Sequence, residues 1–194
     1  MVESSNFHHK IIVLLVGKSG TGKTTIAERC GELYGLRQIQ SYTTRPRRTP
    51  DETGHIFANE RMFHSLGNLV AYTKFNGYEY CATAQQVEDN DIYVIDPKGV
   101  EYFKEHYKGS KQPVIVYIVA SKDPHKAFNL CYERMKERGS SIDEAVERAV
   151  FDNREFSGFE DKADYIFSNE DPEDIDRIAE SICRIIRTGG FDEQ

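Results

Sequence analysis

The strongest chemical signal in the sequence is the glycine-rich segment Gly17-Lys-Ser-Gly-Thr-Gly-Lys-Thr24, which matches the pattern G-x-x-x-x-G-K-[ST]. Glycines let backbone N–H groups close around phosphate oxygens, and the positive end of a following helix adds to the attraction. Lys23 can reach the β- and γ-phosphates, and the Thr24 hydroxyl can ligate Mg²⁺. We therefore predict a site for ATP with Mg²⁺, formed by Gly17, Lys18, Ser19, Gly20, Thr21, Gly22, Lys23, Thr24 and Thr25.

A strand and a helix must position this loop. Residues 11–16 form an apolar run rich in β-branched residues, which is typical of a strand buried on both faces of a parallel sheet. Residues 24–34 have a helix-compatible pattern that Gly35 ends. The same alternation continues with strands over 92–96, 114–119 and 163–167, and with helices to about 107 and over 123–138, 141–156 and 175–186.

Alternating strands and helices predict an α/β fold, with a P-loop NTPase-type parallel sheet and helices on both of its faces. Residues 70–75 and 78–83 flank Asn76-Gly77, a dipeptide preferred in hairpin turns, so we predict a small antiparallel subdomain there. The expected organisation is a flexible start (1–10), a single domain (11–188) and a flexible tail (189–194). Within the domain we expect a core (11–42 and 84–188), an acceptor subdomain (43–83) and a helical lid (about 134–156).

Composition excludes several classes of protein. The formal charge of -7 argues against a protein that coats nucleic acid, because such binding needs a basic surface. Cys30, Cys81, Cys131 and Cys183 form no C-x-x-C pair, so we expect free thiols rather than a zinc or redox site. No apolar run is long enough for a membrane span or signal sequence. We expect a soluble, cytoplasmic monomer or homodimer that binds neither nucleic acid nor membrane.

A second anion site is indicated by Ser41-Tyr-Thr-Thr-Arg-Pro-Arg-Arg48, which gathers three arginines beside four hydroxyl residues after a second predicted strand. Arginine offers a rigid fork of donors that suits a dianionic phosphate, and hydroxyls add donors without charge. Taken alone, the segment would be a solvated basic turn. Beside a phosphate loop, it indicates a site for the phosphate of an acceptor.

These motifs together resemble those of guanylate kinases, over about residues 11–187. That family carries an S-x-T-T-R-x-x-R segment after its second strand, as residues 41–48 do here. Tyr80-Cys-Ala-Thr83 resembles its Y-G-[ST] segment, and Ile95-Asp-Pro-Lys-Gly99 resembles its D-x-x-G stretch. Arg134 to Gly139, with Arg148 in the next helix, looks like the family's lid, and 168–171 looks like its adenine-side loop.

The resemblance implies a role for each matching residue. The acceptor would be bound by Ser41, Arg45, Arg48, His55, Tyr80, Thr83 and Asp96. Charge on the transferred phosphoryl group would be neutralised by Lys23, Arg45, Arg134, Arg138 and Arg148. Asn169 would touch adenine, and Thr24 and Asp96 would lie near Mg²⁺. The activity implied is ATP-dependent phosphoryl transfer to a nucleoside monophosphate, with GMP or dGMP as the acceptor.

Three positions depart from the family. A guanine site needs a carboxylate and a hydroxyl, and the corresponding positions are Ala71 and Ala82. Glu79 or Glu52 could supply a displaced carboxylate, although a solvent-facing charge is the plainer interpretation of each. His55 stands where the family has a phosphate-binding tyrosine.

Four functions therefore stay open. They are a GMP kinase, a kinase for another nucleotide or small phosphorylated acceptor, an inactive binding module of the same fold, and a regulatory switch. The intact phosphate loop argues against the binding module. A switch would want an N-K-x-D motif, which the sequence lacks.

Overall fold

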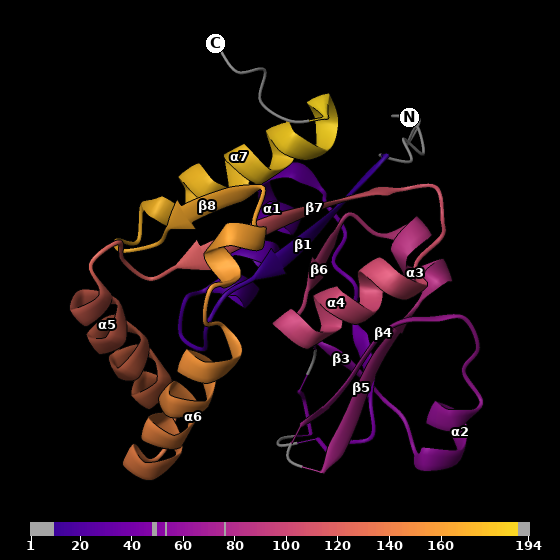
Figure 1. Cartoon of the computed structure of the whole chain (residues 1–194), viewed down its shortest axis with the longest axis horizontal. Coiled ribbons are helices and arrows are strands. Elements are labelled where there is room, and N and C mark those ends of the chain that lie inside the picture. The colour runs from indigo at the N-terminus through magenta and orange to yellow at the C-terminus, as the bar shows by residue number, and fades with distance from the viewer. Residues whose placement is uncertain (1–9, 48–49, 53, 76, 190–194) are drawn as a thin grey trace.

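Two four-stranded sheets organise the chain, which a computed structural model describes over residues 10–47, 50–52, 54–75 and 77–189 (Figure 1). The larger sheet is parallel and has the order β6-β1-β7-β8. Its strands are β6 (Ile92–Val94), β1 (Ile11–Val16), β7 (Gln112–Val119) and β8 (Tyr165–Ser168). Every residue of β1 is buried, as its unbroken apolar run predicts for a central strand.

Helices cover both faces of the larger sheet, which confirms the predicted α/β fold class. On one face lie α1 (Lys23–Tyr34) and α7 (Asp174–Thr188), which share a core with alternate residues of β1. On the other lie α3 (Ala84–Asp89) and α4 (Pro97–His106), which pack on the remaining β1 residues. Because successive side chains of a strand point to opposite faces, β1 contributes apolar residues to the core on each side of the sheet.

The smaller sheet has the order β3-β2-β5-β4 and is formed by the segment predicted as the acceptor subdomain. Its strands are β2 (Ser41–Thr43), β3 (His55–Phe57), β4 (Leu69–Phe75) and β5 (Tyr78–Thr83). The hairpin of β4 and β5 is antiparallel as predicted, but β2 and β3 pair in parallel, so the sheet is mixed. The short helix α2 (Glu60–His64) buries Phe63 against this sheet.

The segment before β2 leads from the larger sheet into the smaller one. It forms a parallel bridge between Gln38 and Ile92, and the N–H of Ile39 donates to the carbonyl oxygen of Ile92 at 2.9 Å. Ser41 then begins a strand of the smaller sheet, rather than following a strand of the core. The arginine-rich segment is therefore part of the subdomain from its first residue.

The lid lies on the far side of the molecule from the acceptor subdomain (Figure 1). The residues predicted as the lid, about 134–156, span the end of α5 (Pro124–Glu137) and the whole of α6 (Ile142–Glu155), and the 3-10 turn η1 (Phe159–Lys162) follows. Pro124 occupies the first turn of α5, and Ser141 with Glu144 forms the predicted capping box of α6. Two sequence signals thus fix where both lid helices begin.

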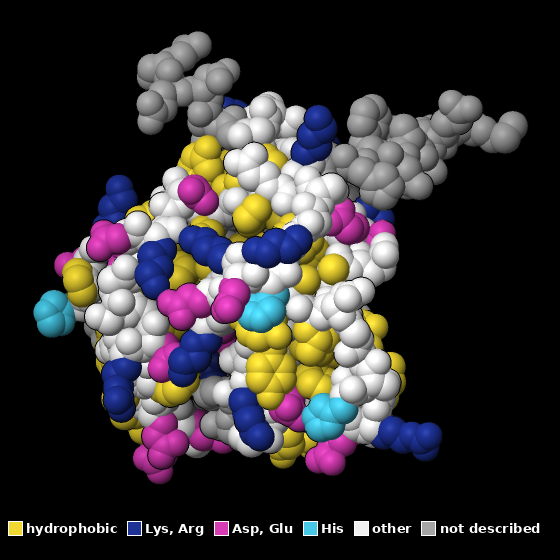
Figure 2. Space-filling model, turned by 45° about the vertical axis from the view of Figure 1, so that its right-hand side comes forward, with side chains coloured by type: hydrophobic (Ala, Val, Ile, Leu, Met, Phe, Trp, Pro, Cys, Tyr) yellow, Lys and Arg dark blue, Asp and Glu magenta, His cyan; other side chains and the backbone are white. Residues whose placement is uncertain are grey.

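Acidic and basic side chains are interspersed on the face seen in Figure 2, with no extended area of one sign. All four cysteines are free thiols. Among the described ranges, none of the helices is long and apolar enough to span a membrane. The predictions made for both ends of the chain, for Arg48 and for Asn76 fall outside the described residues.

Candidate active site

The glycine-rich loop joins β1 to α1. Gly20 (φ 81°) and Gly22 (φ 89°) have left-handed backbone conformations, which a residue with a Cβ adopts only at a cost. A Cβ on Gly20 would lie 2.6 Å from the carbonyl oxygen of Cys131, and one on Gly22 would collide with the side chain of Asn169. The loop needs glycines both for its own path and for the close approach of its neighbours.

Lys23 begins α1, and its ammonium turns back into the loop. Its Nζ donates a 2.9 Å hydrogen bond to the carbonyl oxygen of Lys18. Burial lowers the pKa of Lys23 from its ordinary 10.5 to about 8. The carboxylate of Asp152 opposes this shift, whereas the guanidinium groups of Arg148 and Arg138 add to it. A desolvated ammonium beside backbone amides is arranged to receive an anion.

The last turns of α6 rest on the loop through polar contacts. The backbone N–H of Ser19 donates to Oδ2 of Asp152 at 2.5 Å, and Nε of Arg148 donates to Oγ of Ser19 at 2.7 Å. Nζ of Lys18 also donates to Oδ1 of Asn153 at 2.8 Å. The resemblance singled out Arg148, but sequence reasoning missed Asp152 and Asn153. No local pattern distinguishes these residues from the ordinary polar surface of a helix.

Arg134 joins the loop to the segment after β8. Its guanidinium donates to the carbonyl oxygens of Asn169 and Glu170, both at 3.0 Å, and to that of Gly20 at 3.4 Å. The amide of Asn169 donates to the carbonyl oxygen of Thr21 at 2.9 Å. Its buried Oδ1 has no hydrogen-bond partner within the described part of the chain. Arg134 and Asn169 thus frame the loop on the side where adenine was expected.

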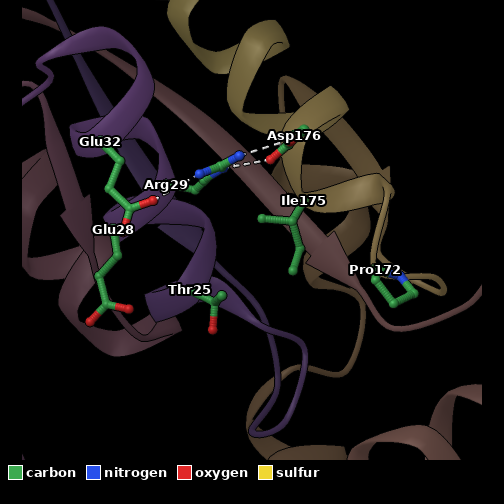
Figure 3. A pocket seen from close by; sticks show the side chains of 7 residues that line it. All are labelled: Thr25, Glu28, Arg29, Glu32, Pro172, Ile175 and Asp176. Atoms are coloured by element: carbon green, nitrogen blue, oxygen red, sulfur yellow. Dashed lines mark hydrogen bonds and ion pairs between the residues drawn. The ribbon is translucent and has the colours of Figure 1, made fainter.

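Beside the loop, a groove runs between α1 and α7 (Figure 3). Arg29 spans it, with Nε and Nη2 donating to the two carboxylate oxygens of Asp176 at 2.6 and 3.1 Å. Thr25, one of the predicted donor-site residues, is exposed at one end of this groove, and Thr24 is exposed next to it. Its other lining residues are Glu28, Glu32, Pro172 and Ile175.

Several predicted acceptor residues share one face of the smaller sheet. The register places Ser41 beside His55, and Thr43 between Phe57 and Tyr80. Since side chains alternate along strands, these five residues point to the same side. The rings of His55 and Tyr80 meet edge to face, with centroids 5.7 Å apart. The sheet thus places Ser41, His55 and Tyr80 on one face.

Arg45 lies two residues after the end of β2 and is 9% exposed. Its guanidinium binds both carboxylate oxygens of Glu52, Nη2 to Oε1 at 2.7 Å and Nη1 to Oε2 at 3.2 Å, and lies over the ring of Phe57. This fork geometry also suits a phosphate. Glu52, considered above as a guanine-reading carboxylate, is held by Arg45 in this structure. The prediction for Arg48 lies outside the described residues.

The two alanines at the expected guanine-reading positions are paired across β4 and β5. Ala71 is 2% exposed and Ala82 is 0% exposed, and both belong to the core cluster that contains Tyr93. Oγ of Ser41 donates to the Tyr93 hydroxyl at 3.3 Å. Burial raises the pKa of Tyr93, so this hydroxyl is neutral. The face beside Ser41 is therefore lined by methyl groups and a tyrosine instead of a carboxylate.

Glu79 is engaged on the opposite face of the smaller sheet. The Tyr72 hydroxyl donates to its Oε1 at 2.6 Å, and Nε2 of His64 lies 3.0 Å from its Oε2. The bond from Tyr72 is the first cause that lowers the pKa of Glu79. Because Glu79 and Tyr80 are consecutive strand residues, Glu79 points away from the face that carries Tyr80.

Three other predicted site residues sit at helix ends. Thr83 caps α3, accepting from the backbone N–H of Gln86 at 3.3 Å, and Asp96 caps α4, with Oδ1 accepting from the N–H of Gly99 at 2.6 Å. Arg138 is exposed at the end of α5. Thr83 and Asp96 thus have local structural partners at the junction of the two sheets.

A parallel sheet with a strand, a glycine-rich loop and a helix at its centre defines a P-loop fold. The sequence matches no protein-family profile and no curated protein sequence. Among solved structures, guanylate kinase from Anaplasma phagocytophilum is similar, with a TM-score of 0.61 and 24% identity, over 95% of this chain and 89% of that one. Shikimate kinase from Bacteroides thetaiotaomicron has a TM-score of 0.45 and 13% identity, with coverage of 88% and 94%. The chain has the guanylate kinase fold, as the resemblance implied.

Proposed function

We propose that this protein transfers the terminal phosphoryl group of ATP to a nucleoside monophosphate. The observation that carries the proposal is the glycine-rich loop at the end of a central strand, into which the half-buried Lys23 turns its ammonium. A second anion-binding group, Arg45, lies in the separate subdomain and already holds a carboxylate in its fork. A phosphotransferase needs two such anion sites, one for each substrate.

The chemistry requires no protein nucleophile, because an oxygen of the acceptor phosphate attacks the γ-phosphorus and ADP leaves in line. Lys23 and the arginines of both sites would position the two anions and neutralise their charge. The buried Oδ1 of Asn169, which lacks a partner within the described ranges, suits a donor nucleotide that brings an N–H group, as adenine does.

Thr24 and Asp96 are the proposed ligands of Mg²⁺. A hydroxyl and a carboxylate are oxygen donors of the kind Mg²⁺ prefers, and the ion commonly takes only one or two protein ligands beside phosphates and water. The exposed hydroxyl of Thr24 at the start of α1 fits this role. When bound, the ion would neutralise charge on the β- and γ-phosphates.

The acceptor proposed first is GMP or dGMP, on the basis of the motif that begins at Ser41. A different acceptor is the second candidate, because Ala71 and Ala82 are buried and Glu79 points to the other face. A site without a carboxylate pays the full cost of leaving the guanine N–H donors unpaired. An acceptor with a different base, or a small phosphorylated compound, avoids this cost.

A coupled assay of ADP release against a panel of monophosphates tests the function. We expect release with at least one acceptor, and its abolition by Lys23→Ala, since the ammonium contacts the phosphates directly. Lys104→Ala, which removes an exposed lysine of α4, is the matched control and should keep full activity. Release that no acceptor stimulates would favour the inactive binding module, and near-normal activity of Lys23→Ala would reject the site.

A further inference from the structure

The phosphate loop already holds an anion that belongs to the chain. Oδ2 of Asp152 lies 2.5 Å from the backbone nitrogen of Ser19, and Asp152 is 3% exposed. Ser19 is within the run of loop residues whose N–H groups would otherwise face a phosphate oxygen. A carboxylate oxygen and a phosphate oxygen make the same charge-assisted bond to such an N–H. The two anions therefore compete for one donor.

The negative charge of Asp152 also opposes the binding of a triphosphate. Its carboxylate is close enough to Lys23 to raise the pKa of that ammonium, and its Oδ1 lies 3.6 Å from Nε of Arg148. A phosphate entering the loop would meet a buried negative charge among the cations it needs. Like charges repel strongly at such a site because little water screens them.

The contacts described above between α6 and the loop are polar and can be exchanged. They are the bonds from Ser19 to Asp152, from Arg148 to Ser19, and from Lys18 to Asn153. Water or a phosphate can replace each partner. The Asp152 carboxylate can therefore leave the loop by a movement of its own side chain, while Phe156 at the end of α6 stays packed in the core against Tyr117 and Phe159.

We infer that Asp152 is an internal competitor of the donor phosphates, so that ATP binds only after it displaces this carboxylate from the N–H of Ser19. The inference rests on the proposed function of the loop as a phosphate site. It explains why a lid residue with no signal in the sequence is nearly inaccessible to solvent and bonded to the loop backbone. Through this contact the lid restrains phosphate binding.

The test measures the affinity of the whole protein for ATP and for pyrophosphate by isothermal titration calorimetry. Asp152→Asn keeps the size and one acceptor oxygen but removes the charge. We expect its Kd for both ligands to fall about tenfold, since a competing charge-assisted bond is lost. Glu147→Gln removes the same charge from an exposed position on the same helix and should change Kd by less than about twofold.

The outcomes distinguish failure of the proposed function from failure of the inference about Asp152. If the wild type binds neither ligand, and Asp152→Asn does not bind either, the proposed function fails. If the wild type binds and Asp152→Asn binds equally well or more weakly, only the inference is overturned.

A second measurement needs no substitution. The carboxylate ¹³C resonance of Asp152 in the wild type, assigned through the backbone, should move toward its solvated value on saturation with pyrophosphate. If it stays unchanged while pyrophosphate binds, Asp152 keeps its bond to Ser19 and the inference is wrong.

Discussion

Replacement of Arg134 by lysine distinguishes a structural role of the guanidinium, which depends on its hydrogen bonds, from an electrostatic role, which needs only its positive charge. Arg134→Lys keeps the positive charge but loses the fork that reaches the carbonyl oxygens of Asn169 and Glu170 at 3.0 Å each. A hydrogen bond from a charged donor contributes about 1.5–3 kcal/mol, and a lysine ammonium recovers roughly one of the two. The expected loss in the free energy of unfolding is therefore about 2 kcal/mol.

Thermal unfolding followed by circular dichroism measures this loss. For a domain of this size, about 1 kcal/mol corresponds to roughly 2–4 °C, so Tm should fall by about 4–8 °C. Arg154→Lys, at an exposed position of α6, is the matched control and should leave Tm within about 1 °C. An Arg134→Lys variant with unchanged Tm would refute the reasoning and leave a purely electrostatic role, as the family resemblance implied.

Two further predictions concern the two anion sites. Because burial lowers the pKa of Lys23 to about 8, the free protein loses this ammonium as the pH rises through 8. Affinity for ATP should therefore weaken about tenfold between pH 7 and pH 9, with proton uptake on binding, measurable by calorimetry in buffers of different ionisation enthalpy. A pH-independent Kd would show that Lys23 stays charged. In the acceptor site, Glu52→Gln weakens the internal partner of Arg45, so KM for the acceptor should fall roughly threefold to tenfold while KM for ATP is unchanged. An unchanged KM for the acceptor would show that Arg45 does not bind the acceptor.

Local chemistry explains which elements the sequence predicts. The loop from Gly17 to Thr24 is recognisable because the strand, the glycines and the helix that it needs are contiguous. The hairpin of β4 and β5 and the start of α6 are equally local, since a turn dipeptide and a capping box specify them. Thr83 shows the limit of this reasoning. Together with Gln86 it forms a capping box for α3, and this pattern in the sequence predicts a helix start at a residue that the resemblance assigned to acceptor binding.

Tertiary packing decides what the sequence does not predict. The strand β2 has only three residues, and its sheet is chosen by partners far along the chain in β3 and β5. Asp152 meets Ser19 across 133 residues, and no spacing rule connects a loop amide with a carboxylate at the end of a lid helix. Glu52 and Glu79 were equivalent candidates in the sequence, but Glu52 lies in a loop and binds Arg45, whereas the pleat of β5 turns Glu79 toward Tyr72.

The two lid helices are attached to the body of the protein in different ways. The backbone of α5 approaches Gly20 so closely at Cys131 that no Cβ fits, and Arg134 fastens the same helix to the segment after β8. The segment containing α6 has a glycine joint on each side, Gly139 (φ 89°) and Gly158 (φ 69°). We expect α5 to stay in place, whereas α6 is joined to it through Gly139 and is held at its other end by Phe156 in the core.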